Sequence, residues 1–163
     1  MSVAAAGAGA PADLNEPQSP ETYLGYLKAS GNNNPDGLIE DRTHVYPAAG
    51  RPAVSHWTLG GAWTLGAEAA TSNAAQARIT YRFRGRDLHL VLGPGANGRA
   101  ARFRIRLDGQ APADDHGVDA AGAGTASEHR LYQLVRQRGS SRARTFEIEF
   151  LGPGVQAFAF TFG

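Results

Sequence analysis

Cysteine is absent from this chain of 163 residues. Its absence excludes a disulfide framework, a cysteine-ligated zinc site, a thiol nucleophile and any thiol redox chemistry by the chain itself. Lysine is almost absent too, since Lys28 is the single lysine in a chain with 15 arginines. No apolar run reaches the roughly 18 residues that a membrane-spanning helix needs, so none is predicted.

Catalytic motifs are also missing. The sequence has no GxSxG nucleophile elbow, no P-loop and no GxGxxG after a strand. No pair of carboxylates can be placed at a glycosidase separation. An HExxH pattern or another recognised metal spacing is not found among the five histidines, His44, His56, His89, His116 and His129. The sequence therefore predicts a protein that is not an enzyme.

The first 18 residues are small and polar and read MSVAAAGAGAPADLNEPQ. They lack the basic start and the apolar block of a signal peptide. Because Ala, Gly and Pro bury little surface to offset the entropy of ordering, we predict a flexible tail or linker over 1–18. One domain over 19–163 is long enough to form a sizeable core. Such a start is typical of a module cut from a longer protein.

Apolar and polar residues alternate with a period of two from Trp57 onward, which is typical of strands with one buried face. Glycine-rich turns, such as Gly60-Gly61 and Gly152-Pro153-Gly154, separate the runs. Short strands without room for helical crossovers predict an all-β antiparallel sandwich or barrel. The strands are expected over 57–59, 62–68, 78–84, 87–92, 102–107, 130–136 and 145–150, with a last strand that places Phe158, Phe160 and Phe162 on one core face.

The segment before these strands has a different character. Ser19-Pro20-Glu21 can cap and begin a short helix, and an extended arm is the alternative. Residues 31–56 contain several prolines and glycines and are expected to be irregular.

Charge is distributed unevenly along the chain. The net charge is −4 over 1–77, +7 over 78–106 and −2 over 107–163. One interpretation is an exposed sheet face on which arginines pair with Glu147 and Glu149 across strands. The other is a groove for an anionic partner such as an acidic glycan, phosphate or nucleic acid. The arginines at polar strand positions are Arg78, Arg82, Arg84, Arg102, Arg104 and Arg106.

Candidate ligand contacts follow from side-chain chemistry. Trp57 and Trp63 flank Gly60-Gly61, where they either pack in the core or stack on a sugar. Open sheet faces are expected to add further polar contacts. The full candidate set is Trp57, Trp63, His56, Arg102, Arg104, Arg106 and Tyr132.

A loop over 108–119 concentrates carboxylates. Oxygen-rich loops can hold calcium, so Asp114, Asp115 and Asp119 are candidate ligands of a structural calcium ion. The alternative is a polar hairpin that turns at Asp108-Gly109. No other cofactor is predicted.

The chain contains, in this order, SPETYLGY, HWTLGGAWTLGAEAA, RITYRFRGRDLHLVLGP, RFRIRLDGQAP, HGVDAAGAG, RLYQLVRQ and TFEIEFLGPGVQAFAFTFG. This order resembles the C-terminal domain of DipZ-type thiol–disulfide and cytochrome c biogenesis proteins, from about Ser19 to Gly163. The resemblance implies a jelly-roll β-sandwich similar to carbohydrate-binding modules and galactose-binding-like domains. It also implies a neighbouring thioredoxin-like domain in a bacterial, periplasmic or otherwise extracytoplasmic protein. The CxxC motif of that family lies in the thioredoxin domain, so no redox activity is expected here.

Two functions are therefore expected. The first is a non-catalytic module of a thiol–disulfide protein that binds carbohydrate or cell-wall glycan. The alternative is a scaffold that docks the thioredoxin-like domain or a protein client without binding sugar. Nucleic acid is not an expected partner.

Overall fold

The computed structural model describes residues 18–139 and 141–163, so the predicted tail lies almost wholly outside the described residues. Within them the chain forms eleven strands and two short 3-10 helices, η1 (Ala96–Gly98) and η2 (Ala113–Asp115). The strands are β1 (Thr22–Tyr23), β2 (Thr43–Tyr46), β3 (His56–Leu65), β4 (Ala70–Ser72), β5 (Ala77–Phe83), β6 (Asp87–Gly93), β7 (Ala101–Leu107), β8 (Ala123–Ala126), β9 (Arg130–Arg136), β10 (Arg144–Phe150) and β11 (Gln156–Phe162). No helix of the described part has the length and hydropathy to cross a membrane.

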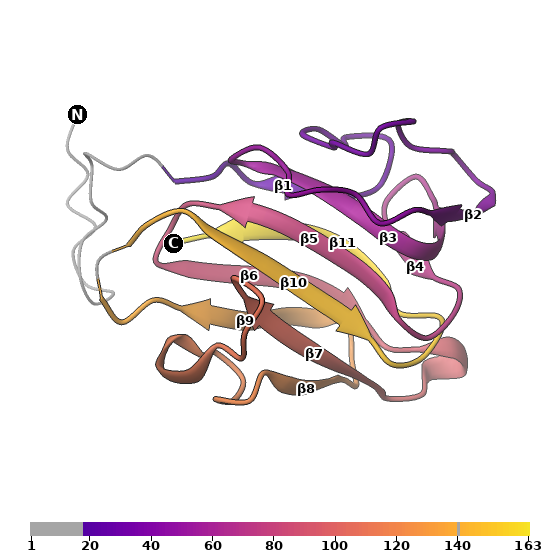
Figure 1. The fold of residues 1–163 in the computed structure, drawn as a ribbon. Helices are drawn as coiled ribbons and strands as arrows, with labels where there is room; N and C mark the ends of the chain where they lie inside the picture. Colours follow the sequence, from indigo (N-terminus) through magenta and orange to yellow (C-terminus); the bar gives the residue numbers. More distant parts are fainter. Residues whose placement is uncertain (1–17, 140) are drawn as a thin grey trace.

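The strands form two layers that are joined through β3 (Figure 1). One layer, called here the β5 sheet, has the order β8-β7-β10-β5-β3. The other, the β11 sheet, has the order β3-β4-β11-β6-β9, with β1 beside β11 and β2 beside β3. Every pairing between these strands is antiparallel. The predicted all-β antiparallel sandwich is confirmed, and its finer jelly-roll class stays a prediction.

Strand β3 passes from one sheet to the other. Its first half pairs with β5, and its second half pairs with β2 and β4. The passage lies at Gly60-Gly61, where Gly61 has a φ of +85° and a Cβ atom would lie 3.1 Å from Ala77 Cα. The predicted break between two strands at this point is therefore wrong. Glycine bends one continuous strand here, because only glycine adopts this φ without strain.

The core lies between the sheets and follows the predicted alternation in β5, β7 and β10. In β5, Ile79, Tyr81 and Phe83 are buried, whereas Arg78 and Arg82 face outward. The inward side chains of β7 and β10 continue the same layer. The polar face of each of these strands is consequently the outer face of the β5 sheet.

A β-bulge changes the pattern in the last strand. Ala157 pairs with Leu92 and Ala159 pairs with Val91, which leaves Phe158 as an inserted residue. Phe160 and Phe162 point inward and contact Tyr81, with ring centroids 4.9 and 5.1 Å apart. The ring of Phe158 instead stacks on exposed His129 at 4.6 Å. The prediction that all three phenylalanines share one core face is wrong, because an inserted residue reverses the alternation.

The N-terminal segment is an extended arm, so the helical alternative for 19–21 is wrong. Strand β1 pairs with β11. The Ser19 amide donates to the Arg84 carbonyl, and the Arg84 amide donates to the Ser19 hydroxyl, both at 2.9 Å. Residues 31–56 were expected to be irregular, yet they contain β2.

Candidate functional site

The two tryptophans are core residues. The side chains of Trp57 and Trp63 are 0% exposed. The Trp57 indole donates to the carbonyl of Ser30 at 2.8 Å, and the Trp63 indole donates to the carbonyl of Gly60 at 2.9 Å. Neither ring offers a face to a ligand, so of the two alternatives core packing is confirmed, and both residues are removed from the candidate ligand contacts.

Tyr132 also lies inside the sandwich, opposite Leu90 of β6. Its hydroxyl donates to the carbonyl of Glu128 at 2.8 Å and accepts from the amide of Ser127 at 3.1 Å. The expectation that it lies on an open sheet face is wrong. His56 is half-buried at the start of β3, and its Nδ1 lies 2.9 Å from the carbonyl of Val54.

Of the seven predicted ligand residues, the structure places four on the outer face of the β5 sheet: three exposed arginines of β7 and, at the other side of that sheet, the half-buried His56 opposite Arg82. Arg102, Arg104 and Arg106 project side by side from the outer face of β7. The tryptophans and Tyr132 lie on the inner side of the sheets and do not join them. The predicted set therefore does not form one site.

Two of the three candidate calcium ligands make side-chain contacts of their own, and Asp114 offers its backbone carbonyl to Arg138 Nε at 3.0 Å. Asp115 accepts from the amide of Arg138 at 2.7 Å and pairs with Arg144 at 3.1 Å. Asp119 accepts from the amide of Ala123 at 2.9 Å. Over 18–139 and 141–163, no group of three acidic, histidine or cysteine side chains is placed to hold a metal ion. The three candidate ligands are therefore not grouped around one position in the described part of the chain.

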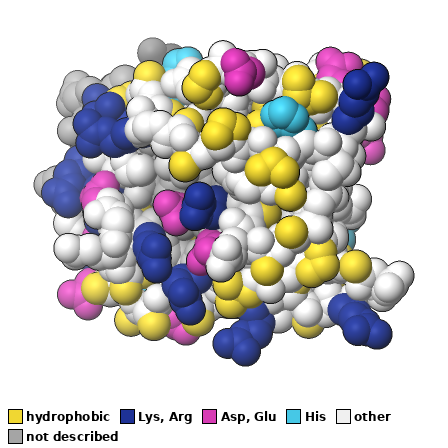
Figure 2. All heavy atoms as spheres, turned by 45° about the vertical axis from the view of Figure 1, so that its right-hand side comes forward, with side chains coloured by type: hydrophobic (Ala, Val, Ile, Leu, Met, Phe, Trp, Pro, Cys, Tyr) yellow, Lys and Arg dark blue, Asp and Glu magenta, His cyan; other side chains and the backbone are white. Residues whose placement is uncertain are grey.

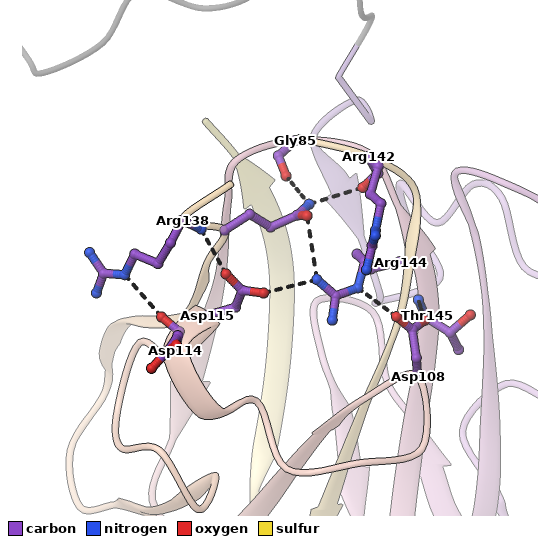
Figure 3. Close-up of polar contacts among 9 residues, drawn as sticks. Gly85, Asp108, Asp114, Asp115, Arg138, Arg142, Arg144 and Thr145 are labelled. Atoms are coloured by element: carbon purple, nitrogen blue, oxygen red, sulfur yellow. Dashed lines mark hydrogen bonds and ion pairs between the residues drawn. The ribbon is translucent and has the colours of Figure 1, made fainter. Parts of the chain in front are cut away.

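The contacts of Asp115 belong to a polar network at one end of the sandwich (Figure 3). Arg144 bonds Asp108 at 2.5 Å as well as Asp115, and its side chain is 11% exposed. Buried Gln137 donates to the carbonyls of Gly85 and Arg142, both at 2.9 Å. Asp87 lies nearby and pairs with Arg136 at 2.8 Å and Arg86 at 3.0 Å. We call this set of residues the closed end: Arg86, Asp87, Asp108, Asp115, Arg136, Gln137 and Arg144.

The carboxylates of the closed end are held ionised. Burial by itself raises the pKa of Asp87, but hydrogen bonds from Arg136 and Arg86 outweigh it and leave the pKa below its ordinary value. Burial likewise raises the pKa of Asp108 and Asp115. Backbone amides and the Arg144 guanidinium outweigh that effect, so both pKa values are lowered. The closed end is thus a structural network.

A hollow of about 460 Å³ lies on the outer face of the β11 sheet. We call it the arm groove, because the N-terminal arm forms one wall. Leu27 in that wall is 70% exposed, and the stacked pair of Phe158 and His129 also lines the hollow. Lys28 lies 5.1 Å above the Tyr23 ring. The lining includes Glu21, Tyr23, Leu27, Lys28, Glu68, Val91, His129, Phe158 and Thr161.

The outer face of the β5 sheet is charged. Register places Glu149 between Arg104 and Arg78, and Glu147 between Arg106 and Thr80. Figure 2 shows basic and acidic side chains interspersed on part of the surface of the molecule. We call this the arginine face, and its arginines are Arg78, Arg82, Arg102, Arg104 and Arg106.

None of these five arginines lies within 4.0 Å of a carboxylate oxygen of any residue that the structure describes. Register places Arg78, Arg104 and Arg106 opposite Glu147 or Glu149, as one interpretation predicted, whereas Arg82 and Arg102 lie opposite Thr145 and Thr125. The ion pairs themselves are not formed there.

A family model described as "Thioredoxin like C-terminal domain" matches residues 19–163. The chain belongs to this family. A search of curated proteins finds no match. As a thioredoxin-like C-terminal domain, the chain is an associated domain, and its family implies a thioredoxin-like neighbour.

Sequence reasoning missed the arm groove of this thioredoxin-like C-terminal domain. Phe158 was assigned to the core, and the arm was not placed against any strand. One signal was available: β6 and β11 carry apolar residues at outward positions as well, namely Val91 and Ala159. Strands that are apolar on both faces are typical of a sheet that is covered on both sides.

Proposed function

We propose that the chain is a non-catalytic accessory domain of an extracytoplasmic thiol–disulfide protein, and that its arm groove docks the thioredoxin-like neighbour. The arm groove is the observation that carries this proposal. The thiol chemistry would belong to the neighbour, since this chain has no cysteine.

The lining of the groove suits a protein partner. Exposed Leu27, the half-buried Tyr23 and Phe158 and the aliphatic Val91 form an apolar centre. Charged side chains, including Glu68, line the groove as well. An apolar centre inside a polar rim is the usual arrangement of a protein–protein interface.

The position of the arm supports the same partner. Ser19 is anchored to Arg84, and Glu21, only two residues further on, already lines the groove. A domain joined through the flexible linker predicted over 1–18 would therefore be tethered at the border of the groove. Such tethering raises the effective concentration of the neighbour, so that a weak interface is sufficient.

Carbohydrate binding in the same groove is the second candidate. Aromatic rings beside carboxylates, here Tyr23 and Phe158 with Glu21, are a combination that sugar sites use. It ranks second because His129 covers one face of Phe158, Lys28 lies over Tyr23, and both indoles are buried.

The test is an NMR titration of the ¹⁵N-labelled chain, first with the thioredoxin-like domain and then with oligosaccharides derived from cell walls. We expect the thioredoxin-like domain to shift the amide signals of Tyr23, Val91, Phe158 and Thr161. Shifts of these four groove amides with oligosaccharides alone would support the second candidate and contradict docking, and unmoved groove amides with both ligands would contradict both.

A matched pair of variants sharpens this test. Leu27→Asp should weaken docking by about tenfold or more, because it places a charge in the apolar centre. Val45→Asp is the control, since Val45 is 67% exposed on β2 and does not line the groove. Equal affinities of the two variants would place the interface elsewhere.

A further inference from the structure

We infer that the arginine face binds an acidic polysaccharide, with its arginines on carboxylate groups and its glutamates on hydroxyl groups. This surface belongs to the β5 sheet, whereas the arm groove belongs to the β11 sheet. The inference therefore does not depend on the function proposed for the groove.

The guanidinium groups form a repeating array. Outward residues of one strand are about 7 Å apart, and strands are about 5 Å apart. Arg102, Arg104 and Arg106 thus repeat along β7, and Arg78 lies two strands away from Arg104 with Glu149 between them. An array of this kind suits a ligand that carries acid groups at repeated positions.

The donors of these arginines are available to a ligand. At the closed end, Arg86, Arg136 and Arg144 each bond an aspartate. The arginine face has five arginines against Glu147 and Glu149, and none of the five is ion-paired among the described residues. The planar guanidinium presents two parallel N–H groups that match a carboxylate.

The other side chains of this face favour an acidic polysaccharide over nucleic acid, membrane lipid and polyphosphate as the ligand. Outward positions of β3, β5, β7 and β10 carry Arg, Thr, Glu and His56 but no Phe, Tyr or Trp. Proteins that bind single-stranded nucleic acids stack the bases on aromatic side chains, and proteins that bind membrane surfaces insert apolar side chains into the lipid. This face has neither kind of side chain at its outward positions, so neither partner suits it. Glu147 and Glu149 would repel closely spaced phosphates, whereas a carboxylate accepts hydrogen bonds from sugar hydroxyls.

A small polar hollow on the same face fits a hydroxyl-bearing group. It has a volume of about 120 Å³ and is bordered by Ala48 and Ala49. Thr58, Thr80, Glu147 and Arg78 also line it, so acceptors and donors stand together.

Calorimetric titration of the full chain with oligogalacturonate, a linear polymer of uronic acid, tests the inference. We expect binding at low salt that weakens as salt rises, and no binding of a neutral dextran oligosaccharide of equal length. Arg104→Gln should lower the affinity about fivefold or more, whereas Arg42→Gln, at an exposed position beside β2, should leave it unchanged. Absence of binding at low salt, or equal effects of the two substitutions, would overturn the inference.

Glu149→Val separates a polysaccharide site from general ion exchange. If the glutamate accepts sugar hydroxyls, the variant binds oligogalacturonate more weakly. If the face only attracts negative charge, removal of a carboxylate strengthens binding, which would overturn the inference. Inorganic polyphosphate is titrated as a comparison ligand. A higher affinity for polyphosphate than for oligogalacturonate would also overturn the inference. Thermal unfolding of each variant checks that the fold is retained.

Discussion

The closed end and the arginine face use the same residue in opposite ways. At the closed end, Arg86, Arg136 and Arg144 bond to the aspartates Asp87, Asp108 and Asp115. On the arginine face, side chains at alternate positions of β5 and β7 project outward and form no ion pair with described residues. The comparison teaches that the high arginine content serves two purposes, one in stability and one in recognition.

The largest effect is expected for Arg144→Gln. The substitution leaves Asp108 and Asp115 without their guanidinium partner, and it should lower the free energy of unfolding by about 2–3 kcal/mol. Urea denaturation at neutral pH measures this. A loss below about 0.5 kcal/mol is typical of surface substitutions. Such a result would mean that Arg144 stabilises the fold no more than the arginines of the arginine face do, and would contradict the comparison.

A similar but smaller loss is expected for Gln137→Ala. Its amide satisfies the carbonyls of Gly85 and Arg142 in a site where the residue is 4% exposed. Unsatisfied buried acceptors cost about 1–3 kcal/mol, so unfolding should require correspondingly less urea. Gln133→Ala on β9 is the control, because Gln133 lies on the outer face beside His89, and it should change stability by less than about 0.5 kcal/mol.

Acid should weaken the closed end. Since the folded-state pKa of Asp87 lies below its unfolded value of about 3.9, its contribution is present above that pH and is lost as pH falls through the folded pKa. Asp87→Asn should therefore cost about 1–2 kcal/mol at pH 7, and the difference from the parent chain should shrink in acid. Thermal unfolding over a pH series measures this. A constant difference across the series would show that the charge of Asp87 does not carry the effect.

The smallest effect on stability is expected on the arginine face. Arg104→Gln and Arg106→Gln should each change the free energy of unfolding by less than about 0.5 kcal/mol, because both side chains are exposed and unpaired among the described residues. The same denaturation assay measures both variants. A loss comparable to that of Arg144→Gln would show that the face arginines are structural after all.

The sequence predicted the regular strands well, because alternation records which side is buried. In β5, β7 and β10, outward arginines and glutamates separate inward aromatic and aliphatic residues, and these strands were located to within a residue or so. Strands β2, β4 and β8 were missed, since three or four residues hold too little alternation and depend on their partners.

The candidate site was predicted poorly for three physical reasons. Alternation cannot reveal an inserted residue, so the bulge that turns Phe158 outward was invisible. A tryptophan satisfies the same pattern in a core and on a surface, so the burial of Trp57 and Trp63 required the packed structure. Arg144 and Asp108 are 36 positions apart, and no local pattern predicts such a pairing.

The central claim is that the arginine face binds ligand while the closed end only stabilises the fold. An NMR titration of the ¹⁵N-labelled chain with oligogalacturonate at low salt tests it most directly, because each amide reports its own position. The account predicts shifts along β5, β7 and β10 at the outward residues, with the amides of Gln137 and Asp115 unmoved. Shifts confined to the closed end, or none at all, would contradict it.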